Sequence, residues 1–155
     1  MAFATSGVFG SLLEDALENT TAYALASDSF KVALFDNVTV PDVDASAANN
    51  VYGSGTWTTT NEVADGTNWD AGGEPLVTPT STRATGVYTF DGEDTVQGGA
   101  NTTLAAVYGA AIFDTTVANA GICFNDFGGS QGVTSGDFTV QWHANGIFTI
   151  TFTAA

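Results

Sequence analysis

Basic residues are almost absent from this chain of 155 residues, which has one lysine, Lys31, and one arginine, Arg83, against seventeen acidic residues. The formal net charge is therefore −15 at neutral pH. Proteins hold nucleic acid by placing several Lys or Arg side chains on phosphates, so we expect no nucleic-acid partner. The same shortage of positive charge argues against binding to a membrane surface.

Cysteine and histidine are scarce too. A single cysteine, Cys123, excludes an intrachain disulfide and a site with several thiolates. A single histidine, His143, leaves zinc without a histidine cluster, so we expect neither a metal nor a cofactor. No segment approaches the roughly 18 apolar residues of a membrane-spanning helix, and the N-terminus lacks the features of a signal peptide. We therefore expect synthesis in the cytoplasm.

The residues that are plentiful favour a β-rich domain. Hydrophobic residues make up 44% of the chain and charged residues only 12%, and there are 18 glycines. The length is typical of one domain with a substantial core. We expect a single domain over 1–155, with an N-terminal arm and helix in 1–28 and an antiparallel β-sandwich or jelly-roll-like fold in 29–155.

Residues 6–19 carry the pattern of the single expected helix. Ser6 can cap it, and apolar residues recur at three- and four-residue spacing. These are Val8, Phe9, Leu12, Leu13, Ala16 and Leu17. The pattern predicts a stripe that is buried against a sheet or a neighbouring subunit.

From residue 29 the hydrophobic period changes to two, which indicates strands. We expect them at residues 30–36, 55–63, 74–80, 86–91, 102–113, 121–126, 137–143 and 147–153. The longest link, 40–54, is polar and is expected to be a surface excursion. The last two strands are predicted to pair as a hairpin around Gly146, because a three-residue loop there places Trp142 opposite Phe148 with the apolar side chains on one face.

The segment 128–132 matches the G-x-S-x-G pattern of a nucleophile elbow around Ser130, and Asp137 and His143 follow in α/β-hydrolase order. An elbow needs a helix after the serine, but here another strand follows. Asp137 and His143 would also lie about 20 Å apart along one strand. We therefore interpret the segment as a glycine-rich hairpin loop and expect no enzyme and no catalytic residues.

Two carboxylate clusters and one group of aromatics have alternative interpretations. The Asp42 and Asp44 pair, and the cluster at 91–94, are expected to be solvated turn carboxylates, with a structural Ca²⁺ as the alternative. Cys123 is expected to be a small buried hydrophobe. The large aromatics are expected to fill the core, with a sugar- or protein-binding surface as the alternative. They are Trp57, Trp69, Trp142, Tyr52, Tyr88 and Tyr108.

Several segments, in their order and spacing, resemble a family of small virion structural proteins of tailed bacteriophages. The matching segments are Ser11-Leu-Leu-Glu-Asp-Ala-Leu17, Lys31-Val-Ala-Leu34, Thr60-Asn-Glu-Val63, Trp69-Asp-Ala-Gly-Gly73, the strand from Thr102 to Ile112, Asp126-Phe-Gly-Gly129, Gly136-Asp-Phe-Thr-Val-Gln-Trp142 and Gly146-Ile-Phe-Thr-Ile150. They cover nearly the whole chain. Proteins of this family are described as head decoration or minor structural proteins.

The resemblance implies a capsid decoration, or cement, protein without catalytic activity on the outer surface of an icosahedral phage head. The expected partners are the major capsid protein and further copies of the chain, as a dimer or trimer. We expect the contacts to involve Phe3, Phe9, Leu12 and Leu13. The alternative is a tail- or fibre-associated virion protein that binds a host surface glycan through exposed Trp57 and Trp69.

Overall fold

A computed structural model describes residues 3–97 and 102–153, and it confirms a mainly β, antiparallel fold with an α-helix near the N-terminus. Ten strands, one α-helix and one short 3-10 helix are found among the described residues. In chain order they are β1 (Gly7–Val8), α1 (Gly10–Glu18), β2 (Phe30–Phe35), η1 (Thr59–Asn61), β3 (Glu74–Pro75), β4 (Thr80–Ala84), β5 (Val87–Asp91), β6 (Thr95–Gln97), β7 (Thr103–Asp114), β8 (Ala120–Thr134), β9 (Phe138–Val140) and β10 (Phe148–Thr151).

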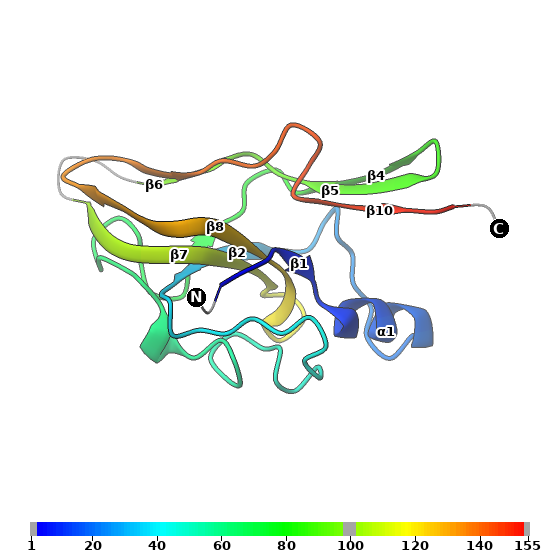
Figure 1. The fold of residues 1–155 in the computed structure, drawn as a ribbon. Helices are drawn as coiled ribbons and strands as arrows, with labels where there is room; N and C mark the ends of the chain where they lie inside the picture. Colours follow the sequence, from blue (N-terminus) through cyan, green and yellow to red (C-terminus); the bar gives the residue numbers. More distant parts are fainter. Residues whose placement is uncertain (1–2, 98–101, 154–155) are drawn as a thin grey trace.

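The strands form three antiparallel sheets arranged in layers. A five-stranded sheet has the order β1-β8-β7-β2-β3, a three-stranded sheet the order β10-β5-β4, and β6 pairs with β9. Figure 1 shows the two smaller sheets end to end above the five-stranded sheet, with long loops beneath it and α1 at one end. The architecture is therefore sandwich-like, with one face of the central sheet covered by strands and the other by loops.

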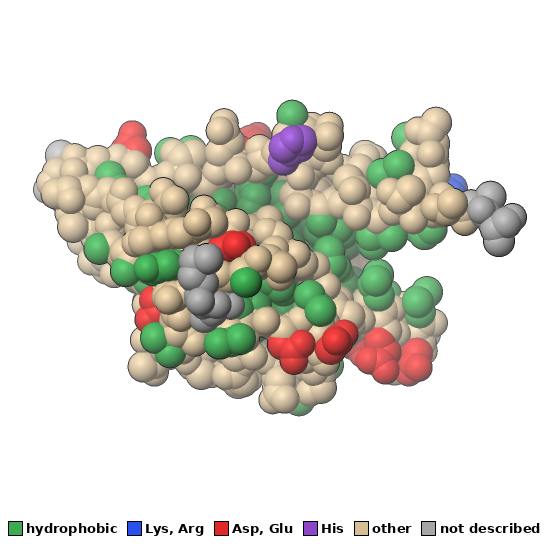
Figure 2. Space-filling view, in the orientation of Figure 1, with side chains coloured by type: hydrophobic (Ala, Val, Ile, Leu, Met, Phe, Trp, Pro, Cys, Tyr) green, Lys and Arg blue, Asp and Glu red, His purple; other side chains and the backbone are tan. Residues whose placement is uncertain are grey.

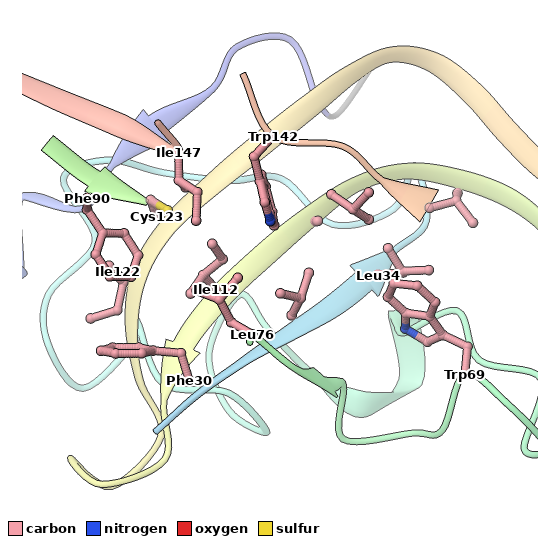
Figure 3. Packing of buried hydrophobic residues seen from close by; sticks show 14 of the residues in the cluster. Phe30, Leu34, Trp69, Leu76, Phe90, Ile112, Ile122, Cys123, Trp142 and Ile147 are labelled. Atoms are coloured by element: carbon pink, nitrogen blue, oxygen red, sulfur yellow. The ribbon is translucent and has the colours of Figure 1, made fainter. Parts of the chain in front are cut away.

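The central strands bury side chains on both faces, which gives the protein two hydrophobic clusters. We call the cluster between the sheets the upper cluster and the cluster on the loop-covered face of the central sheet the lower cluster. In β2, Val32 and Leu34 belong to the upper cluster, whereas Ala33 and Phe35 belong to the lower cluster. The upper cluster lies between the sheets, and Figure 3 shows Trp142 and Ile147 pointing from the upper layer toward β7. Continuous apolar runs in β2 and β7 follow from this two-sided burial, because neither face meets water.

The N-terminal segment differs from its prediction, because the helix begins at Gly10 and not at Ser6. Residues Gly7 and Val8 are extended and pair with Phe124 and Cys123 of β8. Ser6 accepts a hydrogen bond from the backbone N–H of Asp126 and caps no helix. Residues 6–8, which precede the helix, are therefore joined to the central sheet.

Two of the predicted strands have other structures. Residues 55–63 form a loop with η1, because Trp57 turns inward and packs on Phe35 with ring centroids 4.9 Å apart. The strand predicted over 74–80 shrinks to β3, and the polar strand β4 follows where none was expected. The short strand β6 was also missed; its residues pair with β9.

The predicted C-terminal hairpin is wrong. Strand β9 pairs with β6 and β10 pairs with β5, so the chain crosses from one sheet to another between them. Gly146 makes the crossing possible, with a positive φ of 101° and with the backbone oxygen of Phe90 only 2.8 Å from where a Cβ would stand. Trp142 and Ile147, on either side of the crossing, both enter the upper cluster. The burial of Trp142 and Ile147, rather than pairing between neighbouring strands, therefore determines the path of the chain from β9 to β10.

The loop over residues 40–54 is not a plain surface excursion, because Asn50 lies in the core, only 2% exposed. Its side-chain amide donates hydrogen bonds to Ser11 Oγ and to the backbone oxygen of Gly121, both over 3.1 Å. Its Oδ1 accepts from Trp57 Nε1, also over 3.1 Å. Asn50 therefore ties α1, β8 and the loop at Trp57 together.

Replacing Asn50 is expected to destabilise the protein strongly. Asn50→Ala leaves a buried indole N–H and a buried carbonyl without partners, and the free energy of unfolding should fall by about 3 kcal/mol. Urea denaturation followed by tryptophan fluorescence measures the change. The control is the exposed neighbour, Asn49→Ala, which should stay within about 0.5 kcal/mol of the wild type. Equal losses in the two variants would contradict the role of Asn50.

Candidate functional site

The residues of the G-x-S-x-G match lie inside a strand. Strand β8 continues beyond its predicted end at residue 126 to Thr134, so Ser130 is an exposed strand residue and not part of a hairpin loop. The shallow hollow around Ser130 is lined by residues of β7 and β8, and neither Asp137 nor His143 is among the described residues that line it. His143 is exposed, and its Nδ1 accepts the backbone N–H of Asn145.

Carboxylates of both clusters accept hydrogen bonds from backbone N–H groups. Asp42 accepts the backbone N–H of Asp44, and Asp91 accepts that of Gly92. Asp94 accepts from the backbone N–H of Trp142. Within residues 3–97 and 102–153, no group of three or more His, Cys, Asp or Glu side chains is placed to hold a metal ion.

The tryptophans belong to the core, as expected. Trp57 is 2% exposed and Trp69 is fully buried, and Trp142 is buried as well. The three tyrosines are half-buried: Tyr52, Tyr88 and Tyr108. Exposed Trp57 and Trp69, the basis of the glycan-binding alternative, are therefore absent. Cys123 is buried too, and burial raises the pKa of its thiol.

Most of the predicted contact residues pack inside the chain. Phe3 and Phe9 lie in the lower cluster with Trp57, and Leu12 lies in the upper one. Only Leu13, 41% exposed, stands on the surface. A contact through the other three would require the N-terminal segment to leave the core, because their side chains are already covered.

An apolar groove opens beside Leu13, between α1 and the three-stranded sheet. We call it the helix–sheet groove; its volume is about 450 Å³. Its lining residues are Leu12, Leu13, Ala16, Tyr23, Ala24, Leu25, Ala26, Ser27, Ser81, Tyr88, Phe148, Ile150 and Phe152. Figure 2 shows hydrophobic side chains on both sides of this hollow, below the three-stranded sheet and above α1.

Strand alternation builds the upper wall of the groove. In β10, Phe148 and Ile150 face the groove, whereas Thr149 and Thr151 lie on the opposite face. Tyr88 is the register partner of Ile150 and therefore shares its face. The apolar alternation continues past the strand to Phe152, which is 59% exposed. One face of this sheet is thus apolar beyond the point where the core ends.

The helix supplies the lower wall of the groove and turns its acidic residues elsewhere. Leu13 and Ala16 line the groove, and Leu17, one turn after Leu13, is 84% exposed. Glu14 and Glu18 lie four residues apart and so share the neighbouring face of α1. Figure 2 shows acidic side chains along the side of α1 that is turned away from the sheet. These carboxylates therefore lie away from the groove, whose lining contains no acidic side chain among the described residues.

A buried acid supports the loop that closes the inner end of the groove. Asp28 accepts the backbone N–H of Ala24, which fixes the turn over residues 24–28. Asp114 lies beside Asp28 and is buried, with its Oδ1 accepting the backbone N–H groups of Thr116 and Val117. Burial raises the pKa of Asp114 against these hydrogen bonds, and the charge of Asp28 raises it further.

The sequence does not predict the groove, because two of the segments that line it have no hydrophobic pattern. Strand β4 is largely polar, and the loop 23–27 has no periodicity. The signal that was available is the alternation of threonines with Phe148, Ile150 and Phe152, which defines one apolar face up to the last described residues. From the sequence alone, this alternation predicts a core-facing strand.

Comparison with family models, with curated proteins and with solved structures finds no match for this chain. None of the helices in the described ranges is long and apolar enough to cross a membrane.

Replacing Asp114 by Asn should stabilise the protein near neutral pH. The folded pKa of Asp114 lies above the unfolded value, so its stabilising contribution is complete at acid pH and is lost as the pH rises through the folded pKa. Asp114→Asn keeps the acceptor oxygen and removes the buried charge. We expect a melting temperature a few degrees higher at pH 7, and a flatter pH profile above about pH 4.

Thermal melts between pH 4 and pH 8 measure both effects. The matched control is Asp42→Asn, since Asp42 also accepts a backbone N–H two residues ahead but is exposed. That variant should leave the profile unchanged. A lower melting temperature for Asp114→Asn at pH 7 would contradict the assignment of a costly buried charge.

Proposed function

We propose that this chain is a capsid decoration protein that binds the outer surface of an icosahedral tailed-phage head and stabilises it. The observation that carries the proposal is the helix–sheet groove, an open apolar surface on a strongly acidic protein. Apolar surface exposed in one contiguous patch is typical of a site that another protein covers. Its lining residues include no charged side chain among those described, so the groove is better suited to adhesion than to chemistry.

The charge of the chain supports a position on the outside of a head. A net charge of −15 is repelled by packaged nucleic acid and favours a surface that faces solvent. It also keeps unbound copies apart in solution. The resemblance to phage virion proteins points in the same direction, and the major capsid protein is the partner it implies.

Stabilisation would follow from mass action. A protein that binds the assembled lattice and not its dissociated subunits shifts the equilibrium toward the lattice. Copies held next to one another on a symmetric shell, as dimers or trimers, would raise one another's effective concentration, so each contact can be weak. The glycan-binding alternative is not favoured by any observation, since Trp57 and Trp69 are buried.

The stoichiometry in purified particles tests this function. Quantitative mass spectrometry of intact virions should find the chain in copy numbers comparable with those of the major capsid protein, because a decoration protein follows the symmetry of the lattice. Heads from which the chain has been removed should disassemble at a lower temperature than intact heads. Adding the purified chain back should restore the original disassembly temperature. Absence from virions, or a handful of copies at the tail, would contradict the proposal.

A further inference from the structure

We propose that the outer edge of strand β10 binds a second copy of this chain, and that the two copies pair there as antiparallel strands around a two-fold axis. The pairing would join their three-stranded sheets into one continuous sheet. The surface is the strand edge itself and not the helix–sheet groove beneath it. The inference goes beyond the proposed function, because the purified chain alone can show or refute it whether or not the chain binds a capsid.

Strand β10 lies at the edge of its sheet, next to β5, and Figure 1 shows it running outward past the five-stranded sheet. Phe152 donates its backbone N–H to the backbone oxygen of Gly86 over 2.7 Å, which fixes the phase of the ladder. Residues along a strand direct their backbone groups to alternate sides, so Ile150 bonds to β5, whereas the N–H and C=O groups of Thr149 and Thr151 point away from it. Both threonines are exposed. Their backbone groups therefore form an open edge.

The strands at the other sheet edges carry features that hinder pairing with a further strand. β1 and β3 have two residues each, β6 and β9 have three, and β3 contains Pro75. Strand β4, at the opposite edge of the same sheet as β10, is largely polar and carries Arg83. Short strands, proline and charge commonly protect an exposed edge. Around β10 these features are missing, since residues 147–153 include no charged residue, proline or glycine.

The edge of β10 is complementary to itself. In an antiparallel pair with a two-fold axis at Ile150, the outward N–H and C=O groups of Thr149 meet those of Thr151 in the second copy, and each donor finds an acceptor. The same register places Phe148 opposite Phe152, and Ile150 opposite its own copy. The backbone phase and the side-chain alternation both have a period of two. Apolar residues therefore meet apolar residues on one face, and threonines meet threonines on the other.

This pairing would cover apolar side chains that the fold leaves accessible. Phe152 is 59% exposed, and Phe148 and Ile150 are half-buried. Cross-strand pairs of aromatic or β-branched side chains stabilise a sheet, and pairs of threonines add to them. A strand of another protein would need the same alternation of apolar and polar residues to match this edge as well. A second copy of the chain has that alternation in the required phase.

The net charge of the chain opposes the approach of two copies, since each carries −15. Strand β10 has no charged residue, so the repulsion comes from the rest of the molecule and acts over a distance. Salt screens such repulsion, because the Debye length falls from about 10 Å at 0.1 M to about 3 Å at 1 M. One pair of short strands also buries less area than a standard protein interface. The dimer should therefore be weak at low salt and tighter at high salt.

Sedimentation equilibrium of the purified chain tests the dimer at about 0.1 M and about 1 M sodium chloride. We expect monomers and dimers in equilibrium, with a dimer dissociation constant about threefold or more lower at the higher salt concentration. Monomers alone under both conditions would overturn the proposal. So would oligomers that keep growing with protein concentration, because a two-fold pair of β10 edges closes at two copies.

Proline substitutions at the two edges of one sheet identify the edge that pairs. Thr151→Pro removes an outward N–H and should keep the bonds to β5, so it should weaken the dimer about tenfold or more. The matched control is Ser81→Pro in β4. Its N–H also points away from β5, because its register partner Phe90 directs its backbone groups to β10. The control should dimerise like the wild type, and melting curves check that both variants are folded. Unchanged dimerisation of Thr151→Pro, or an equal loss in Ser81→Pro, would overturn the proposal.

Cysteine substitutions test the register independently of the proline variants. Ile150 and its copy would have Cα atoms about 4.5 Å apart, within the range that a disulfide spans. Phe152 and its copy would lie about 13 Å apart along the strands. Oxidised glutathione, as the electron acceptor, should therefore convert Ile150→Cys but not Phe152→Cys into a disulfide-linked dimer. The wild type gives the background, because its Cys123 is buried. Cross-linking of Phe152→Cys alone, or of neither variant, at concentrations where the wild type dimerises would overturn the proposal.

Discussion

Two-sided burial of the central strands is the constraint on which the rest of the fold depends. Strands β2 and β7 bury successive side chains on alternate faces, so neither face of the five-stranded sheet can be left in contact with water. The two small sheets cover one face, and Phe3, Phe9 and Trp57 cover the other. Loop segments with little regular secondary structure are held in place because their side chains pack on the faces of this sheet. Asn50 has the same role for polar groups, since it gives hydrogen-bond partners to atoms that the lower cover would otherwise bury without them.

The helix–sheet groove follows from the same constraint, because the three-stranded sheet that covers the central sheet extends beyond it. Phe90 packs against Phe30 at the edge of the central sheet, and β5 and β10 then continue outward over α1. Along this overhang the strands keep their alternation, with Ile150 turned toward the helix and Thr149 and Thr151 turned away. A strand that merely ended in solvent would need no apolar side chain at these positions. The fold therefore explains where the groove lies, whereas burial within this chain does not account for the exposed apolar side chains of its walls.

Much of the fold class could be predicted from local patterns, but little of the pairing could. Strand β2 and strand β7 appear nearly as expected, because long apolar runs between polar turns indicate strands whatever their neighbours are. The C-terminal hairpin failed because nothing in the residues around Gly146 tells that β9 and β10 have different partners, β6 and β5. Strand β8 continues past Gly128 and Gly129, where its register with β7 shifts, because pairing resumes at Gln131 opposite Val107, and glycine weakens a strand prediction made without that partner.

The candidate site shows why the sequence could not separate core residues from surface ones. Leu12 and Leu13 are consecutive, equally apolar and part of one helical stripe, yet Leu12 is 3% exposed and Leu13 is 41% exposed. The difference depends on how far the three-stranded sheet reaches over α1, which is a property of tertiary structure. An exposed groove of this kind invites self-association, and the net charge of −15 opposes it, because copies of like charge repel one another. The excess of Asp and Glu, which argues against a nucleic-acid partner, therefore also keeps unbound copies apart.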